Sequence, residues 1–399
     1  MLIKRKEFIQ VGSLATASLM LPKFLKAFEG RAMVPAGNKV VVIVQLSGGN
    51  DGLNTIIPVR NDLYYKARPH LGIEATKALS ITDEAGLHPS LTGFKELYDD
   101  GSLGIINSVG YPNPDRSHFR SMDIWQTASQ SNEYLTSGWV GRYLDAQCKG
   151  CDKPTQAIEI DDVLSLSMKG EHMKGIAVKD PRRLYGTANE KFFRDVMKNH
   201  GGNTGEEPVD YLYKTMAETL SSADYIFKQS KLHPTNAEYP KTDLGNSLKT
   251  IASLIFSDIN TKVYYVSLGS FDTHINQEFQ QARLFTQLND AIKSFTADMK
   301  TNGRFEDVLL FTFSEFGRRV SQNASGGTDH GTANNMFLVS GGLKQKGMIN
   351  ELPDLNDLNE GDLKHQVDFK NVYATILKKW LNADDQQILH GKYEMMNFI

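Results

Sequence analysis

Five stretches of the chain are almost unbroken runs of apolar residues, and they constrain the fold more than any other feature. They occupy residues 40–46, 103–109, 262–269, 307–313 and 335–341. An unbroken apolar run is typical of a strand that is buried on both faces, because a half-exposed strand alternates apolar with polar residues. Helical patterns separate these runs. The sequence therefore predicts an α/β fold with a doubly wound, largely parallel central sheet.

Residues 150–250 interrupt this alternation. They are rich in Lys, Asp, Asn and Gly, with short strand-like pieces and helical segments at 187–199, 208–231 and 244–257. We interpret them as an α-rich insertion or cap on one domain that spans residues 38–399. A chain of 399 residues has room for such an arrangement.

The bulk composition excludes some classes of protein. A net charge of −3 creates no basic field, so we expect no nucleic acid partner. No internal stretch approaches about 18 consecutive apolar residues, so we expect no stable membrane span. The two cysteines, Cys148 and Cys151, have no second pair at zinc-finger spacing. After export they could form a local disulfide, or they could remain two thiols.

The N-terminus has the layout of an export signal. Lys4, Arg5 and Lys6 precede a weakly apolar stretch that ends near Leu21. The pattern is similar to a twin-arginine signal, with Arg5-Lys6 where two arginines are usual. We therefore expect residues 1–36 to be a leader for the twin-arginine export machinery and the protein to be periplasmic or at the cell surface. The alternative is a basic amphipathic helix that stays on the folded protein.

Polar residues gather just after the predicted strands. In a parallel sheet, ligands bind outside the carboxyl ends of the strands. Carboxylates and imidazoles that meet there repel one another or lie idle unless a cation neutralises them. Mixed oxygen and nitrogen ligands suit a divalent metal such as Zn, Mn, Mg or Ca. The candidate ligands are Asp51, Asp272, His274, Glu315, Asp329 and His330.

Ester hydrolysis would suit this group. Ser117 is predicted to begin a helix, where the positive end of the helix dipole lies beneath it, and a metal could activate its hydroxyl as a nucleophile. Arg116 and Arg120 flank it in DRSHFRS, and either could hold an anionic group with two parallel hydrogen bonds.

Each candidate also has a purely structural interpretation. Asp51 could be a turn former and Ser117 a helix N-cap. Asp272 could cap the helix that begins near residue 277, and Glu315 could pair with a neighbouring arginine. His330 could be a hydrogen-bonded loop histidine, and both arginines could be solvated charges. The functional interpretation rests on all of them lying at equivalent strand ends.

Several segments together resemble one family. They are VVVIVQLSGGNDGLNTIIP, LHPSLTGFKELYDDGSLGIINSVGYPNPDRSHFRSMDIWQT, FDTHINQ, FSEFGRRVSQNASGGTDHGTANNMFLVSGG and VDFKNVYATILKKWL. The resemblance is to the exported bacterial domain-of-unknown-function family 1501, which is distantly similar to the alkaline phosphatase and sulfatase superfamily. It implies a central sheet, with Asp51 and His330 as metal ligands and Ser117 as nucleophile. Phe316 stands where the superfamily commonly has a histidine, which leaves open one metal, two in altered form, or none.

The sequence thus predicts an exported metal-dependent hydrolase that acts on small phosphate or sulfate esters. The alternative is a non-catalytic exported binding or assembly protein that keeps the fold with a degenerate metal site. Phe316 is the residue that favours this alternative.

Overall fold

The computed structural model describes residues 38–147, 156–192, 195, 222–223, 225–229, 231–257 and 259–399. The predicted leader, Cys148 and Cys151 lie outside these residues. The described residues form two compact units. One contains those between 136 and 236 and between 250 and 265, and the other contains 39–135, 237–249 and 266–399. Among the described residues, no helix has the length and apolar character needed to cross a membrane.

The larger unit contains a sheet built from the predicted apolar runs. Strands β1 (Val40–Leu46), β5 (Leu103–Gly110) and β9 (Val308–Phe313) are buried along their whole length. With β10 (Asn334–Val339) and β11 (Gly347–Met348), the order is β11-β5-β10-β9-β1, and β14 (Val367–Asp368) also pairs with β5. Pairs β1/β9, β11/β5 and β14/β5 are parallel. The predicted α/β class with a largely parallel sheet is confirmed.

Strand β10 runs antiparallel to both of its neighbours, β5 and β9. Since it runs the other way, the loop that precedes β10 starts at the carboxyl end of β9 and stays at that edge of the sheet. The direction of β10 therefore explains how residues before a strand can meet residues that follow the other strands.

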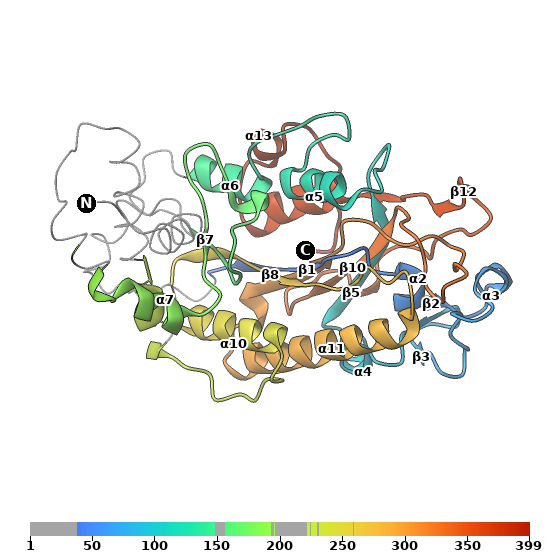
Figure 1. Cartoon of the computed structure of the whole chain (residues 1–399), viewed down its shortest axis with the longest axis horizontal. Helices are drawn as coiled ribbons and strands as arrows, with labels where there is room; N and C mark the ends of the chain where they lie inside the picture. Colours follow the sequence, from blue (N-terminus) through green and yellow to red (C-terminus); the bar gives the residue numbers. More distant parts are fainter. Residues whose placement is uncertain are drawn as a thin grey trace. The chain divides into compact units, whose positions relative to one another are not determined.

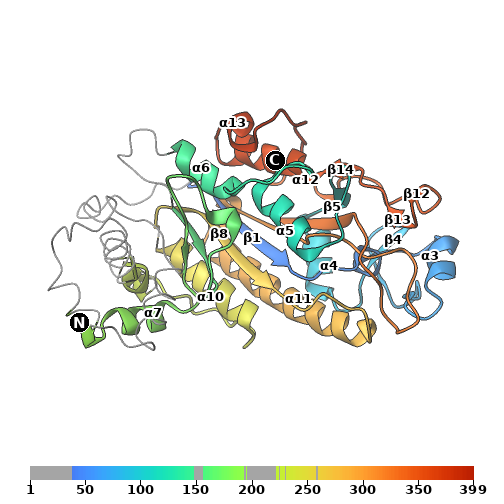
Figure 2. The same cartoon turned by 45° about the horizontal axis from the view of Figure 1, so that its top comes forward.

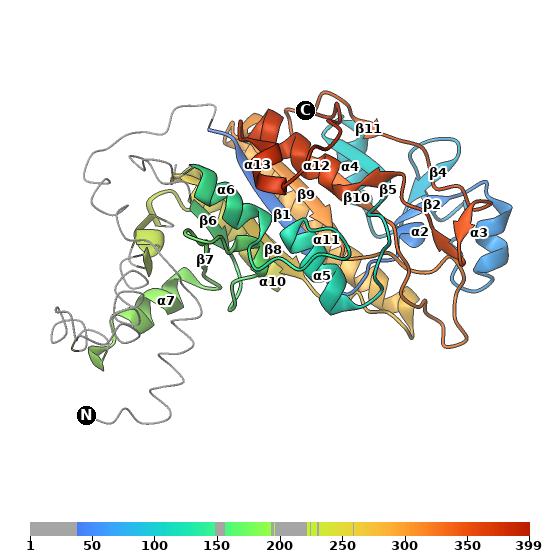
Figure 3. The same cartoon turned by 90° about the horizontal axis from the view of Figure 1, so that it is seen from above.

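Helices cover both faces of this sheet, as expected for a doubly wound fold (Figure 1). On one face, Trp125 of α5 (His118–Thr127) stacks on Phe313 of β9 and on Phe369 of α12 (Phe369–Thr375). Figure 2 and Figure 3 show α5 and α12 on this side from two further directions. On the other face, Phe94 of α4 (Thr92–Asp99) packs on Phe337 of β10. Helix α11 (Gln277–Thr301) lies beside α4, where Asn289 accepts a hydrogen bond from the Gly93 amide.

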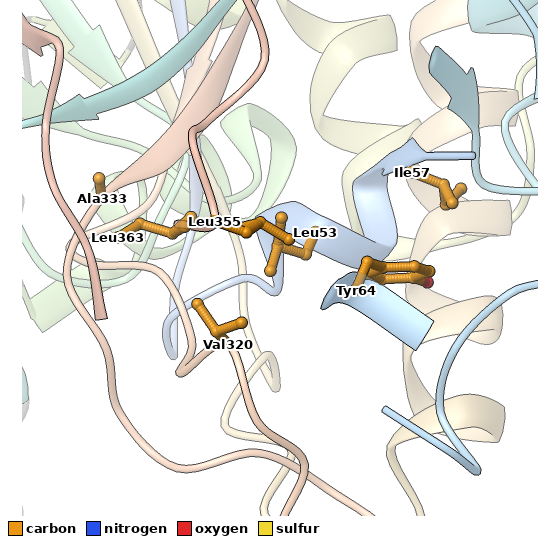
Figure 4. Packing of buried hydrophobic residues seen from close by; sticks show 7 residues of the cluster. All are labelled: Leu53, Ile57, Tyr64, Val320, Ala333, Leu355 and Leu363. Carbon is orange, nitrogen blue, oxygen red and sulfur yellow. The ribbon is translucent and has the colours of Figure 1, made fainter. Parts of the chain in front are cut away.

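A second apolar cluster lies beyond the end of β1, around helices α2 (Gly52–Thr55) and α3 (Asp62–Ala67). A three-stranded sheet, β2 (Ile56–Pro58), β4 (Ala85–Leu87) and β3 (Leu79–Ser80), lies beside it. The hairpin β12 (Leu358–Asn359) and β13 (Asp362–Leu363) follows later in the chain. Figure 4 shows the side chains that form the cluster: Leu53, Ile57, Tyr64, Val320, Ala333, Leu355 and Leu363.

The smaller unit has its own parallel strands. Strand β6 (Gln156–Glu159) pairs with β7 (Ile176–Ala177) and with the first part of β8 (Thr261–Leu268), whose last three residues belong to the larger unit. Helices α6 (Trp139–Gln147) and α7 (Pro181–Ala188) also lie in the smaller unit, and the second half of α10 (Asp243–Phe256) contributes to it. The insertion predicted at residues 150–250 stays a prediction, since much of that stretch lies outside the described residues.

Candidate metal centre

Two glycines allow three strand-end loops of the larger unit to approach one another. Gly48 and Gly49 follow β1 and have φ values of 119° and 79°. A Cβ atom on Gly48 would lie 2.4 Å from the Asp272 amide nitrogen, and one on Gly49 would lie 2.2 Å from the Phe316 ring. Neither the positive φ nor the close contact suits a residue with a side chain. The loops after β1, β8 and β9 therefore meet at one point.

Arg318, which follows β9, holds these loops together. Its fully buried guanidinium donates hydrogen bonds to the carbonyl oxygens of Gly48 at 2.5 Å, Gly49 at 2.6 Å and Phe271 at 2.9 Å. It also donates to Asp272 Oδ1 at 2.7 Å. A planar group with five donors suits several acceptors that converge from different loops. Arg318 thus fixes the backbone around Asp272.

Three potential ligand atoms lie together at this point. Asp272 Oδ1 lies 3.0 Å from His274 Nε2 and 3.1 Å from His330 Nε2, and the two Nε2 atoms are 3.0 Å apart. The side chains are partly exposed, at 47%, 40% and 23% respectively. The sequence predicts all three residues from their positions just outside the strand ends, a criterion that we call the strand-end rule. The structure brings them together.

Hydrogen bonds fix the orientation of both imidazole rings. His330 Nδ1 lies 2.8 Å from the Arg116 carbonyl oxygen, which can only accept, so Nδ1 must carry the proton. His274 Nδ1 likewise donates to Asp329 Oδ1 at 3.2 Å. A hydrogen bond from Asn323, and then the one from His274, lower the pKa of Asp329. In the neutral tautomers, both Nε2 lone pairs therefore point at the shared position, as in metal-ligating histidines.

The donor set fits a divalent cation. Metal–ligand distances of about 2.0 Å place the ligands of a tetrahedral site about 3.3 Å apart, close to the spacings found here. Burial alone would raise the pKa of Asp272, but the hydrogen bond from the Arg318 guanidinium, together with its positive charge, opposes burial, and the pKa is lowered to about 2. Asp272 is therefore a carboxylate at neutral pH. Two lone pairs 3.0 Å apart beside that carboxylate need a proton or a cation between them.

His118, the first residue of α5, adds a fourth group that the sequence analysis missed. Its Nδ1 donates to Glu315 Oε1 at 2.9 Å, and its Nε2 lies 3.5 Å from Asp272 Oδ2. One ligand atom each from His118, Asp272 and His330 lie within 4.8 Å of one another. The signal was the histidine directly after Ser117 in RSHFR.

Glu315 orients His118, and its two oxygens accept hydrogen bonds from donors within the protein. It is 1% exposed, and its Oε1 also accepts a hydrogen bond from the Gly48 amide at 2.8 Å. Phe316 packs against the rings of His118 and His330, with centroid distances of 4.9 and 4.7 Å. The apolar ring of Phe316 thus packs against two of the histidine rings and supports their positions.

The hydrogen bond to Glu315 raises the pKa of His118, against the opposing effect of burial. We expect Glu315→Gln to lower that pKa, because a neutral amide no longer favours the imidazolium. An NMR titration of His118 in chelator-treated protein would measure the shift. Since the folded-state pKa is raised, protonated His118 stabilises the fold below its unfolded pKa, and that contribution is lost as pH rises through the folded value. An unchanged His118 pKa in the variant would contradict the conclusion that Glu315 raises it.

The carboxylate of Asp51 is held by partners of its own within the protein. Its Oδ2 accepts from Arg68 at 2.6 Å and from Gln277 at 2.5 Å, and its Oδ1 accepts from Arg68 at 3.0 Å and from the Leu53 amide at 3.2 Å. Asp51 and Arg68 are both 1% exposed. The carboxylate thus caps α2 and pairs with a buried guanidinium, which accounts for its charge without a metal.

Ser117 is the N-cap of α5, but its side chain makes no capping hydrogen bond. The residue is exposed, so its hydroxyl is open to a ligand. It stands directly before His118 and directly after Arg116, whose carbonyl orients His330. Ser117 is therefore next in sequence to two residues that contact the convergent group.

The two flanking arginines differ. Arg120 is 8% exposed, donates to the carbonyl oxygens of Gln130, Ser131 and Glu133, and stacks on Tyr134. Arg116 is 40% exposed and pairs with Asp362, which is fully buried. Arg319, which the sequence analysis did not single out, also pairs with Asp362 at 3.2 Å. Of the two predicted clamps, Arg116 keeps an accessible guanidinium, whereas Arg120 is occupied within the protein.

A family model described as "Protein of unknown function (DUF1501)" matches residues 228–393. The resemblance to this family is therefore confirmed over that part of the chain. A search of curated proteins found no match.

Several solved structures are similar to this chain. A sulfatase from Pseudoalteromonas sp. has 13% identity and a TM-score of 0.40, with 99% of this chain and 75% of that one covered. A protein in the alkaline phosphatase superfamily from Vibrio parahaemolyticus has 10% identity and a TM-score of 0.35, with 98% and 78% covered. A phosphonate monoester hydrolase from Silicibacter pomeroyi has 8% identity and a TM-score of 0.39, with 90% and 75% covered. The side chains of the candidate metal centre, and not these similarities, carry the functional argument.

Proposed function

We propose that this protein is an exported metal-dependent hydrolase of phosphate or sulfate esters. One observation carries the proposal: Asp272 Oδ1, His274 Nε2 and His330 Nε2 lie 3.0–3.1 Å apart, with both rings oriented from behind by acceptors. These three residues would hold the cation, and His118 could join them. A bound divalent cation would supply Lewis-acid polarisation of the ester and lower the pKa of a nearby hydroxyl.

The residues around this group support roles in ester cleavage. The exposed hydroxyl of Ser117, at the N-terminus of α5, is the candidate nucleophile toward phosphorus or sulfur. Arg116, whose guanidinium is partly exposed and pairs with Asp362, is the candidate to bind a non-bridging oxygen of the anionic ester, while its carbonyl holds His330. His118 directly follows Ser117 in the sequence, and Glu315 orients its ring. Its Nε2 atom is therefore the candidate group to hold or move a proton when Ser117 attacks.

Ser117→Ala is expected to reduce the turnover of 4-nitrophenyl phosphate or sulfate by at least about a hundredfold, because it removes the nucleophile. Stopped or continuous nitrophenol assays with added Zn²⁺, Mn²⁺, Mg²⁺ or Ca²⁺ would measure it. Ser80→Ala, an exposed serine at the end of β3, serves as the matched control and should behave as wild type. Equal inertness of wild type and Ser117→Ala, with metal bound, would instead favour the non-catalytic binding protein.

The export part of the proposal rests on the N-terminal pattern of Lys4, Arg5 and Lys6 followed by a weakly apolar stretch. N-terminal sequencing of protein recovered from the periplasm would test it. We expect the mature chain to begin between residues 27 and 37. Full-length protein confined to the cytoplasm would contradict export without touching the metal centre.

A further inference from the structure

A cavity of ≈ 250 Å³ lies next to the candidate metal centre, inside the larger unit. Its wall includes Phe316, whose ring packs on His118 and His330, and Asp115, which accepts a hydrogen bond from the Ser117 amide at 2.6 Å. The cavity and the centre therefore share a wall on the side where Ser117 stands. The roles proposed above do not use this cavity.

Apolar surfaces dominate the interior of the cavity. The rings of Tyr111 and Phe316 face it, together with Pro114, Ala333 and Leu363. Ala333 and Leu363 belong to the packed cluster in Figure 4, so this part of the wall is rigid and preformed. Such a wall favours a flat apolar group, which gains both area burial and ring contacts.

Several polar side chains in the wall already have partners within the protein. The Tyr111 hydroxyl lies 3.1 Å from Ser121 Oγ and accepts from the Asp115 amide. The Thr332 hydroxyl donates to the Leu363 carbonyl, and Lys364 pairs with Asp357. A sugar ring would need hydrogen-bond partners for several hydroxyls when buried, and these side chains are already engaged, which leaves Asn113, Asn359 and His365 as the other polar side chains of the wall. The chemistry of the wall therefore favours an apolar ring over a polyhydroxylated one.

We propose that this cavity binds the alcohol part of the substrate and that this part is a compact apolar ring, such as an aryl group. The inference rests on the proposed ester hydrolase activity. Apolar cavities of about 150 Å³ accept benzene, so the volume here has room for a substituted or fused ring. Ser117 Oγ would attack phosphorus or sulfur and break the bond to the aryl oxygen, and the proton lost from the serine would end on the departing phenol. Water would then hydrolyse the phosphoserine or sulfoserine, which gives inorganic phosphate or sulfate and restores the serine.

Asn359→Trp tests the proposal, because Asn359 is an exposed residue at the rim of the cavity and an indole there would narrow the entrance. The probes are 2-naphthol for binding, 2-naphthyl phosphate for turnover and methyl phosphate as the small ester. Asn132→Trp, an exposed asparagine outside the lining, is the matched control. We expect Asn359→Trp to weaken naphthol binding and raise KM for the naphthyl ester about tenfold each, with methyl phosphate unaffected. Ala333→Leu would place a larger side chain in the cavity wall, and we expect it to weaken naphthol binding and raise KM for the naphthyl ester in the same way.

The two proposals fail in different ways. If naphthol binds wild type and responds to Asn359→Trp while no ester is hydrolysed, the cavity assignment stands and the hydrolase proposal falls. If both esters are hydrolysed but neither cavity variant changes naphthol binding or the preference between them, the cavity assignment is overturned and the hydrolase proposal stands. Melting temperatures close to that of wild type would show that the variants fold.

Discussion

Replacing His274 with alanine should weaken Zn²⁺ binding by more than about a hundredfold. His274 Nε2 lies 3.0 Å from both Asp272 Oδ1 and His330 Nε2, so its loss removes one corner of the three-atom group that we assign to the cation. The loss of an outer-shell partner typically costs about 10–100-fold in metal affinity, and the loss of a ligand costs more. Asp329→Asn should therefore give the smaller effect, since Asp329 acts only through His274 Nδ1. Competition with a chromophoric chelator would measure both.

The substitution at His274 is well suited to this test, because the side chain is 40% exposed and its removal should leave the fold intact. His233→Ala, at an exposed histidine elsewhere in the chain, controls for the loss of an imidazole. We expect the affinities to rank as wild type and His233→Ala, then Asp329→Asn, then His274→Ala. A wild-type protein that binds none of Zn²⁺, Mn²⁺, Mg²⁺ and Ca²⁺ stoichiometrically, or a His274→Ala protein with unchanged affinity, would remove the basis of the proposed hydrolase.

The buried strands could be predicted from sequence because burial on both faces leaves a local signature. VVVIVQL at 40–46 is β1 with matching bounds, and Gly101, with a φ of 73°, follows α4 as expected for a helix stop. The direction of β10 left no such signature. An apolar run buried on both faces looks the same in parallel and antiparallel pairs, so only the structure shows that β10 opposes β5 and β9.

The strand-end rule found Asp272, His274, Asp329 and His330 because each stands a few residues from a recognisable strand. It could not assign their separate roles. Whether a carboxylate faces a metal or a guanidinium depends on partners that are remote in sequence. Asp329 turned out to support His274 from behind.

Asp51 and His118 show that a sequence pattern can suggest a ligand that has a structural role and can also miss a residue that lies at the site. The charge of Asp51 is accounted for by Arg68, which the chain brings back through α3, so a residue that matched the pattern of a ligand has a structural partner. His118 matched no motif, and its importance comes from Glu315, 197 positions later. Only the three-dimensional structure shows that the two residues of such a pair are in contact. Composition and spacing carry no information about them.

Arg318→Met should be the most destabilising single substitution around the centre, with a loss of at least about 3 kcal/mol in the free energy of unfolding. The guanidinium is buried and donates to the carbonyl oxygens of Gly48, Gly49, Phe271 and Thr328, at 2.5–2.9 Å. Methionine fills much of the volume but donates to none of these carbonyls, so those of Gly48, Gly49 and Thr328 lose the hydrogen bond from Arg318 while Phe271 keeps one from the Thr273 amide. Arg318→Lys should be only a partial remedy, because an ammonium with three donors cannot reach acceptors on several loops.

Urea denaturation in the presence of chelator would measure this effect without a contribution from metal binding. Arg319→Met is a matched control one residue away. Arg319 is 38% exposed, and Asp362 keeps its ion pair with Arg116, so we expect a smaller loss of stability than in Arg318→Met. The difference between the two variants measures how much stability comes from the buried position of the Arg318 guanidinium, because both variants lose an arginine. If the two variants unfold at similar urea concentrations, Arg318 is not what holds the loops after β1, β8 and β9 together. The positions of Asp272 and His274 would then need another cause, such as the cation itself.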